Sequence, residues 1–578
     1  MSPNPRDLLI RGGRVIDGTA APAFEADVRV RDGAICEVGP NLEPKGEATF
    51  DATGCYVSPG FIESHTHYDG TMWWQSDLDP LPGYGVTSLV MGNCGFALAP
   101  LSSDPAVRDQ VVGIFSFFED IPEQPFQQNL PWDWSTWSEY KASLTSNVRV
   151  PANYATYVGH IALRLAVLGL EAWERAATAD EVGKMVELLD DALSAGCLGL
   201  STNFLDHDGQ DRPVPSLHAL DDEFRALFEV LARHPGTSLQ VPIDSIMRLT
   251  AVDSLERLAR LSEGLPIRMQ WGGIPTAQWQ KKLGLQAPLV EIHERFAAEG
   301  RDFWTGFMHA PITTTVGVER TLFFAQSGEF AWHEVVEAGA DDAKLALLRD
   351  PEWRKRARES WDSNKLDAAP YQNPRPILLD NSANGAGPTG ITLGEYADEL
   401  GVHCSDAMAE WIANNGLQST VMMPPWIKDE EMVIRLIRDP KSVGNISDAA
   451  AHGQMFCGAG DNMLLFTDYV RKQGIITVEE AVHVQTGKLA DFFGFADRGT
   501  IAPGKRADIV VFDLDEIEHR PKRKSFDVPD GKGGLTWRWT RDAAPVRLTL
   551  VNGVATFEDG KPTGSRPGDM IGPTASAS

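Results

Sequence analysis

Two histidines separated by one residue, His65 and His67, are the side chains of this sequence best suited to chemistry. They end an apolar run, and on an extended segment the side chains of residues i and i+2 project to the same side. Their imidazoles can therefore reach one cation together, as zinc or a related ion requires. An exposed pair without a ligand is the simpler alternative, and further candidate ligands along the chain argue against it.

Those further candidates also stand at the ends of apolar runs. Asp448 follows one, and a carboxylate in that position is costly unless it is paired, hydrogen-bonded or metal-bound. Cys94 lies among small residues that leave its sulfur room to meet a cation, although a buried inert cysteine is the alternative. His160 and His309 could each be a metal ligand, a substrate contact or a histidine that is hydrogen-bonded in a wall.

The elements that must position these residues alternate between extended and helical patterns. One predicted helix covers 178–195, with acidic residues in its first turn and a glycine after its end. Eight apolar runs are candidate strands: 56–65, 87–92, 153–159, 197–202, 238–244, 266–271, 303–308 and 442–448. Their alternation with helices predicts a (β/α)8 TIM barrel, whose active site gathers at the carboxyl ends of the strands. A run at 421–423 is a competing strand.

Both ends of the chain show the short alternating runs of β-strands. We therefore predict a small β-sandwich domain assembled from residues 1–56 and 491–565, which flanks an α/β barrel of residues 57–490. The tail, 566–578, is rich in Gly, Pro, Ser and Thr, and we expect it to be disordered.

Two long insertions interrupt the barrel pattern, at about 100–148 and 313–376. Both carry many aromatic residues: Phe115, Phe117, Phe118, Trp132, Trp134 and Trp137 in the first, and Trp332, Trp353 and Trp361 in the second. Insertions of this length in a compact barrel are usually lids or substrate-binding walls. Satellite cores or a contact within a homo-oligomer are the alternatives.

Composition limits the partners. A net charge of −29 argues against nucleic acid and anionic membranes, which demand a basic surface. No window offers the roughly 18 apolar residues of a membrane span, and the first residues lack the pattern of a secretory signal. The six cysteines show no paired spacing and indicate reduced thiols. We expect a cytoplasmic protein that acts on a small molecule.

Together these residues resemble the amidohydrolase superfamily, and within it the N-acyl-D-amino-acid deacylase (D-aminoacylase-like) branch. The resemblance covers nearly the whole chain, in the segments 8–18, 59–67, 85–95, 159–164, 195–202, 447–452 and 498–513. The segment 91–95 is the more specific signal for the branch, whereas 498–513 is typical of the superfamily. The segment 120–134 is similar to a less characterised subgroup.

The resemblance implies a metal-dependent hydrolase of the amide bond in an N-acyl (D-)amino acid or a related small amide. His65, His67 and Asp448 would bind one metal, zinc or another divalent transition metal, and Cys94 would reach a second or bridging position. Asp448 would also act as general base and acid, because it would take a proton from the attacking water and deliver it to the leaving nitrogen.

The chain departs from the family pattern at two positions. Family members place a histidine at the end of strand 5 and another at the end of strand 6, where this chain has Gln240 and Gln270. One tight metal site is therefore expected, completed by Cys94 or His309. The predicted substrate contacts are His160, His309, His452, Gln240, Gln270 and Arg164. For a carboxylate clamp the candidates are Arg164, Arg248 and Arg268, with ordinary salt bridges as the alternative.

Other functions remain open at the level of sequence. The same barrel could hydrolyse a cyclic or aromatic amide or a lactone. A single bound metal could also support a non-hydrolytic decarboxylation. The missing histidines allow a degenerate barrel without turnover, although retention of all four candidate ligands argues against it. Zinc binding and activity on an N-acyl substrate would separate these possibilities.

Overall fold

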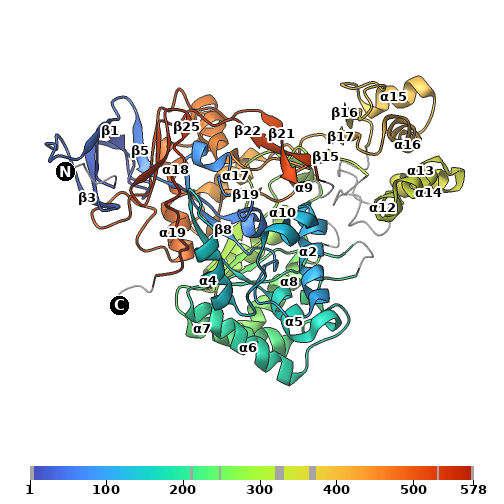
Figure 1. Ribbon diagram of the computed structural model, residues 1–578, viewed down its shortest axis with the longest axis horizontal. Helices are drawn as coiled ribbons and strands as arrows, with labels where there is room; N and C mark the ends of the chain where they lie inside the picture. The colour runs from blue at the N-terminus through green and yellow to red at the C-terminus, as the bar shows by residue number, and fades with distance from the viewer. Residues whose placement is uncertain are drawn as a thin grey trace.

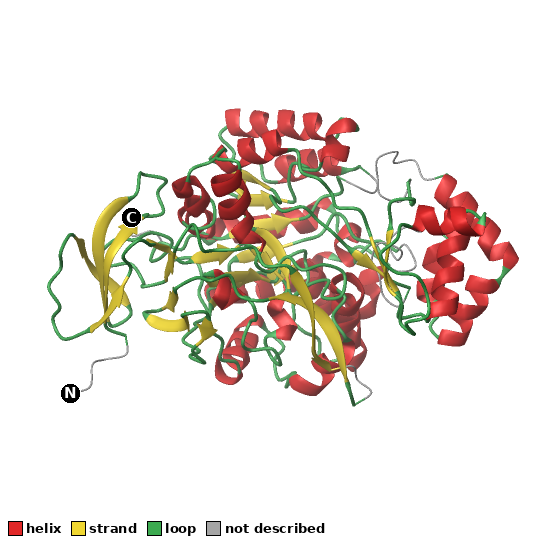
Figure 2. Ribbon diagram, turned by 90° about the horizontal axis from the view of Figure 1, so that it is seen from above, coloured by secondary structure: helices red, strands yellow, loops and turns green. Residues whose placement is uncertain are grey.

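The computed structural model describes residues 6–208, 212–245, 249–318, 331–363, 373–529 and 533–574. The molecule is elongated, with a β-sheet built near both termini at one end, an α/β body in the middle and a helical lobe at the other end (Figures 1 and 2). None of the helices in these segments is long and apolar enough to cross a membrane. All six cysteines are free.

The terminal sheet has nine strands and draws on both ends of the chain. Its strands are β1 (Leu8–Val15), β2 (Phe24–Arg31), β3 (Ala34–Gly39), β4 (Ala48–Asp51), β5 (Tyr56–Pro59), β20 (Ile509–Phe512), β23 (Leu548–Val551), β24 (Val554–Glu558) and β25 (Lys561–Pro562). The two halves meet where β5 pairs with β20 in antiparallel register. Aliphatic side chains from both halves, among them Val28, Val57, Ile509 and Leu550, form one core beneath this junction.

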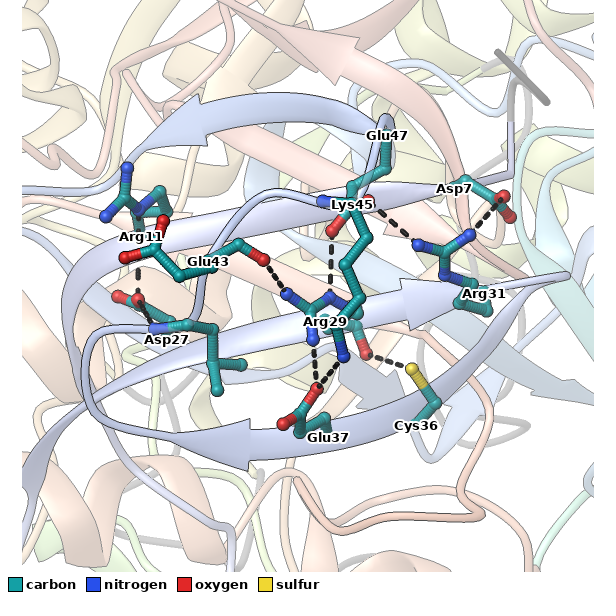
Figure 3. Close-up of polar contacts among 11 residues, drawn as sticks. Asp7, Arg11, Asp27, Arg29, Arg31, Cys36, Glu37, Glu43, Lys45 and Glu47 are labelled. Atoms are coloured by element: carbon teal, nitrogen blue, oxygen red, sulfur yellow. Dashed lines mark hydrogen bonds and ion pairs between the residues drawn. The ribbon is translucent and has the colours of Figure 1, made fainter.

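A buried ion pair fastens the outer strands of this sheet (Figure 3). The Arg29 side chain is only 2% exposed, and its Nε donates to Glu47 Oε1 at 2.8 Å. Its remaining nitrogens donate to Glu37 and to the carbonyl of Glu43, and Arg31 donates to the second oxygen of Glu47 at 2.8 Å. Because every charge in the group is paired, burial is tolerated here, whereas loss of one partner would be costly.

The body is built on parallel strands. They are β6 (Phe61–Glu63), β7 (His65–Thr66), β8 (Val86–Met91), β9 (Asn153–Thr156), β10 (Val158–Gly159), β11 (Gly199–Ser201), β12 (Ser238–Val241), β13 (Arg268–Trp271), β14 (Phe303–Gly306), β18 (Ser442–Val443) and β19 (Ile446–Ala449). Parallel pairing runs through β6-β8-β9, through β10-β11-β12-β13-β14-β18, and between β19 and β7. Every predicted run contains a strand, but the run 56–65 divides, because β5 joins the terminal sheet while β6 and β7 enter the body.

Helices connect and cover these strands. The longer ones are α5 (His160–Leu168), α6 (Ala179–Ser194), α7 (Asp221–Arg233), α8 (Ala251–Leu261), α10 (Gln286–Ala298), α17 (Glu430–Arg438), α18 (Val478–His483) and α19 (Gly487–Phe493). Helix α6 matches the predicted helix, and a capping box between Thr178 and Glu181 fixes its start. The other helical segments are α1 (Tyr68–Thr71), α9 (Gln278–Lys282), 3₁₀ turns at Leu81–Tyr84, Gly169–Trp173, Pro215–His218 and Asp461–Met463, and a π-helix at Leu465–Lys472.

The first insertion folds as α2 (Pro105–Glu119), α3 (Glu123–Asn129) and α4 (Trp137–Asn147). Its aromatic side chains do not form a separate layer. Phe115, Phe118, Trp134 and Trp137 are buried in the main core, and Phe117 and Trp132 pack against it half-buried. The insertion is therefore anchored on the body, and α2 reaches the strand ends.

The second insertion forms the helical lobe of Figures 1 and 2. It contains α12 (Trp332–Glu337), α13 (Asp341–Arg349), α14 (Pro351–Asp362), α15 (Leu393–Leu400), α16 (Cys404–Asn415) and a small sheet of β15 (Thr315–Val316), β16 (Leu378–Asn381) and β17 (Thr420–Met422). Trp332, Trp353 and Trp361 lie in a core of the lobe's own, which is the satellite-core alternative. The lobe extends past the predicted end at residue 376, and the competing strand at 421–423 belongs to it.

The last part of the chain differs from the prediction in two places. β21 (Lys522–Pro529) and β22 (Leu535–Arg541) form a separate antiparallel hairpin instead of joining the terminal sheet. The tail prediction is wrong for 566–574, since Ile571 donates to the Tyr154 carbonyl at 2.8 Å and Thr574 to that of Gly494 at 2.9 Å. Gly568 permits this course, because a Cβ there would lie 2.0 Å from the Ala152 carbonyl oxygen. Residues 575–578 lie outside the described segments.

Candidate metal centre and active site

Strand pairing brings the predicted ligands together. His65 lies in β7 with His67 directly after it, and β19, which contains Asp448, pairs with β7 in parallel. Cys94 follows β8, whose neighbour β6 leads into β7. Because the carboxyl ends of parallel strands meet at one edge, residues that are nearly 400 positions apart in sequence become neighbours in space.

Three pairs of candidate ligand atoms are spaced about as a tetrahedral cation requires. Asp448 Oδ1 lies 3.2 Å from His65 Nε2 and 3.6 Å from His67 Nε2. Cys94 Sγ lies 3.2 Å from His65 Nε2, and ligand atoms of the two histidines and the cysteine all fall within 4.8 Å of one another. Zinc bond lengths of about 2.0–2.3 Å place tetrahedral ligand atoms roughly 3.3–3.7 Å apart. The residues therefore fit a zinc-sized ion.

The backbone at this site is held in an unusual conformation. Cys94, Asp448 and His452 have φ angles of 57°, 51° and 50°, in the left-handed region that non-glycine residues seldom adopt. Such strain costs roughly 1–3 kcal/mol per residue and persists where surrounding contacts impose it. At Cys94 these contacts are a backbone N–H donated to Gln240 Oε1 at 2.9 Å and a carbonyl that accepts from Asn203 at 2.8 Å.

Burial and mutual charge set the protonation of the ligands. Burial lowers the pKa of His65 to about 4, against the opposing charge of Asp448. Burial raises the pKa of Asp448, but the charges of His65 and His67 outweigh it and hold that pKa well below its usual range. A neutral imidazole and an ionised carboxylate are the forms that bind a cation. Burial also raises the pKa of Cys94, so a bound cation would have to stabilise its thiolate.

The structure adds an acidic residue that the sequence did not indicate. Glu119, at the end of α2, is buried with Oε1 3.4 Å from His67 Nδ1. Burial raises the pKa of Glu119 to about 8, opposed by the proximity of His67. Burial lowers the pKa of His67, but Glu119 and Asp448 outweigh it and raise that pKa to about 9. The available signal was an acidic side chain directly after the aromatic run 115–118, because a carboxylate on a buried helix face demands a partner.

A cavity of about 700 Å³ opens beside the ligands. Asp448 lines it, and the Asp448 side chain is 24% exposed, compared with 10% for His65 and 1% for His67. The walls come from the first insertion, the helical lobe and the β21–β22 hairpin, with aromatic side chains Trp74, Phe456, Trp537 and Trp539. Of the candidate ligands His65, His67 and Asp448, Asp448 is thus the one that faces the cavity.

Two of the predicted substrate contacts, Gln240 and His452, lie near the candidate ligands, a third is the strand neighbour of Gln240, and a fourth faces another loop. Gln240 and Gln270 are opposite each other on β12 and β13; Gln240 accepts from the Cys94 N–H, and Gln270 donates to the Trp271 carbonyl at 3.1 Å. His452 Nε2 lies 3.6 Å from Glu119 Oε2. His309 Nε2 instead lies 3.0 Å from the carbonyl oxygen of Asp461.

His160 and Arg164 belong to a buried network away from the cavity. His160 Nε2 lies 2.9 Å from Glu223 Oε1, and Arg164 donates to the other oxygen of the same carboxylate. Both are fully buried and neither lines the cavity. Arg268 starts β13, at the amino end of that strand, and is paired with Asp302 at 2.7 Å. Arg248 lies outside the described residues. The role of these residues as substrate contacts stays a prediction, which this geometry does not favour.

Two imidazoles, a carboxylate and a thiol gather at the ends of parallel strands beside a cavity, and this donor set is a candidate metal site of the kind that hydrolases use. The model of the amidohydrolase family matches residues 48–354 and 394–557, and the chain belongs to that family. Of the unmatched residues 355–393, the described ones, 355–363 and 373–393, fall within the helical lobe.

Similarity to D-aminoacylase, in sequence and in structure, supports the D-aminoacylase-like branch of the family. The chain is 26% identical to D-aminoacylase of Alcaligenes xylosoxydans xylosoxydans over 99% of this chain and 98% of that protein. It is 28% identical to an uncharacterised protein of Mycobacterium tuberculosis over 96% and 92%. A solved structure of D-aminoacylase superposes with a TM-score of 0.63 at 27% identity, covering 98% of this chain and 99% of that one. The predicted family is thereby confirmed, and the protein is an amide-bond hydrolase.

Proposed function

We propose that this protein is a zinc-dependent hydrolase that cleaves the amide bond of an N-acyl-D-amino acid to a carboxylate and a free amino acid. The observation that carries the proposal is Asp448, which is ion-paired with two histidines and also lines the cavity. The likeness to D-aminoacylase supports the substrate class. The parallel pairings, including β19 with β7, support a single (β/α)8 barrel as the scaffold.

One tight metal site accounts best for the donor set. His65, His67, Asp448 and Cys94 would hold the cation, and catalytic zinc also accepts a fifth ligand, which leaves a position open. The positions that could complete a second site, Gln240 and Gln270 (on β12 and β13), carry neutral amides, which are weak zinc ligands. The solved D-aminoacylase is described by one-metal activation and second-metal attenuation of a binuclear centre, so one metal is compatible with this chemistry.

The proton transfers fall to Asp448. A divalent cation held by His65, His67, Asp448 and Cys94 would supply an activated water and polarise the amide carbonyl. Asp448 is ionised at neutral pH because its pKa is depressed, so its carboxylate can accept the proton released as water adds to the carbonyl. The same carboxyl then delivers that proton to the amide nitrogen as the C–N bond breaks, which releases a neutral amine and restores the carboxylate.

The lining of the cavity favours a bulky apolar acyl group. Trp74, Phe456, Trp537 and Trp539 line it, and two of these come from the β21–β22 hairpin. Aromatic side chains bury large apolar areas and stack on other rings at 4.5–7 Å between centroids. A ligand pocket of about 700 Å³ lies in the usual size range for small molecules. An arylacyl group should therefore bind better than acetyl.

The test is a matched substrate panel on protein purified without added metal or chelator. Metal content per chain is measured first, and release of free amine is then followed for N-acetyl and N-phenylacetyl derivatives of the same D- and L-amino acids. We expect about one zinc per chain, hydrolysis of the D series, and higher kcat/KM for the phenylacetyl compounds. Zinc-loaded protein that cleaves only cyclic amides or lactones, or only releases CO₂, would contradict the proposal.

A further inference from the structure

Helix α2, which the first insertion contributes, ends between two histidines of the site. Its last residue is Glu119, whose side chain is 4% exposed. Glu119 Oε1 lies 3.4 Å from His67 Nδ1, and Glu119 Oε2 lies 3.6 Å from His452 Nε2. One carboxylate thus faces an imidazole beside β7 and another in the segment that follows β19.

Backbone contacts fix the end of the helix in this place. The carbonyl of Glu119 accepts the N–H of His452 at 2.5 Å, and Asp120 Oδ2 accepts the N–H of Gln454 at 3.3 Å. Asp120 closes the helix in the left-handed conformation, with φ of 54°, and the N–H of the next residue, Ile121, donates to the Phe115 carbonyl at 3.4 Å. The end of α2 is therefore tied to the loop directly after Asp448.

Packing aligns the helix with the other side of the site. The rings of Phe118 and Phe96 stack with centroids 5.2 Å apart, and Phe115 meets Phe96 edge-on at 6.4 Å. Phe96 lies two residues after Cys94, and its ring is 6.4 Å from that of His67. The position of the Glu119 carboxylate is thus set by contacts to both ligand-bearing segments.

The orientation of His67 gives this carboxylate a role. His67 directs Nε2 toward Asp448 Oδ1, at 3.6 Å, and Nδ1 toward Glu119. A carboxylate at one ring nitrogen holds the proton there, and this leaves the lone pair of the other nitrogen free for a cation. We propose that Glu119 is a positioning residue that acts through His67 to set the cation affinity of the site. The inference rests on the proposed metal-dependent function.

The inserted helix is then part of the metal centre, because undocking of α2 would remove the outer partner of a ligand. Histidine ligands in metalloproteins are oriented by such outer carboxylates, and removal of the partner typically weakens metal binding 10- to 100-fold.

Zinc affinity, measured by competition with a chromophoric chelator at constant pH, tests the proposal on the full-length protein. Glu119→Gln keeps the size of the side chain and removes its charge, and we expect its zinc Kd to rise about 10- to 100-fold. Asp109→Asn, on the same helix with a 60% exposed side chain, is the matched control and should stay within twofold of wild type. Glu119→Asp keeps the charge and should recover part of the affinity.

Thermal unfolding separates positioning from support of the fold. A Glu119→Gln protein that unfolds at lower temperature but binds zinc like wild type would overturn the proposal. If that variant does not fold, equal zinc Kd values for Glu119→Asp and wild type would overturn it as well. Tight zinc binding by wild type without hydrolysis of any N-acyl amino acid would refute the proposed function alone, because zinc affinity is read independently of turnover.

Discussion

Replacement of Asp448 by asparagine separates proton transfer from the architecture of the site. The amide oxygen of asparagine can occupy the place of Oδ1, 3.2 Å from His65 Nε2 and 3.6 Å from His67 Nε2, and the two side chains are nearly equal in volume. What the variant lacks is a negative charge and a group that can accept a proton near neutral pH. The fold should therefore persist, while the chemical step loses its carrier.

The size of the effect follows from the role. General acid–base catalysis contributes about 10²- to 10⁴-fold to a rate, which corresponds to about 3–5 kcal/mol at 1.36 kcal/mol per decade. Asp448 would act on both the attacking and the leaving atom, so the loss should lie toward the upper end of this range. Because proton transfer belongs to the transition state, kcat and kcat/KM should fall together with little change in KM.

The assay is steady-state release of amine from an N-acyl-D-amino acid, with zinc content measured on the same samples. Asp253→Asn, which changes an exposed carboxylate on α8, controls for the loss of one charge and should retain wild-type kcat. An Asp448→Asn protein that holds one zinc per chain and keeps more than a tenth of the wild-type kcat would refute the assignment of Asp448 as proton carrier.

Three further outcomes are expected. Cys94→Ala should weaken zinc binding more than about 100-fold, beyond the usual cost of losing an outer partner of a ligand. Cys197→Ala, which removes a buried thiol that donates to the Thr156 carbonyl, is the control and should leave zinc binding unchanged. Equal zinc Kd values for Cys94→Ala and wild type in chelator competition would make Cys94 a packing residue. Glu47→Gln should destabilise the terminal sheet by about 3 kcal/mol in urea unfolding. Burial raises the pKa of Glu47, but its hydrogen bonds and Arg29 outweigh this and hold the pKa below 4.5. The difference in unfolding free energy between variant and wild type should therefore persist above that pH and shrink as the pH falls below it. Burial lowers the pKa of Lys488 to about 8 from 10.5, so between these pH values the unfolded state binds more protons than the folded state and the free energy of unfolding rises with pH. At about 1.4 kcal/mol per pKa unit, wild type should gain roughly 3 kcal/mol of unfolding free energy relative to Lys488→Met across this window. Parallel pH profiles of the two proteins would refute the depressed pKa of Lys488.

The candidate ligands of the proposed metal site could be read from the sequence. His65 and His67 declare themselves by a spacing of two residues on an apolar extended run, since strand periodicity alone places them on one side. Asp448 and Cys94 follow other apolar runs, and the rule that active sites collect at the carboxyl ends of parallel strands brings all four together before any coordinates are known. In the structure the side-chain atoms of Asp448 and Cys94 lie 3.2–3.6 Å from those of the two histidines, and their role as metal ligands stays a prediction.

Local pattern located helix α6 and a strand within every predicted run of the body, but not the larger grouping of these elements. The predicted insertion ended at residue 376, yet the lobe continues through α15 and α16, because Trp411 packs into the same core as Trp332 and Trp353. A tail rich in glycine and proline read as disorder, although Gly568 lets the backbone pass close to Ala152. Shared cores and close approaches depend on residues distant in sequence, which composition does not describe.

Tertiary structure alone decided what surrounds the ligands. Nothing local to Glu119 indicates that it will face His67 and His452, which are 52 residues before it and 333 residues after it; the docking of α2 creates that contact. The same holds for His160, a candidate for the cavity by sequence, whose partner Glu223 arrives on another helix and keeps it buried. The sequence by itself determined which side chains could bind a cation, because periodicity along one strand is a local property. Packing decided which groups orient those ligands and which walls face the substrate, because such contacts exist only after distant segments have come together.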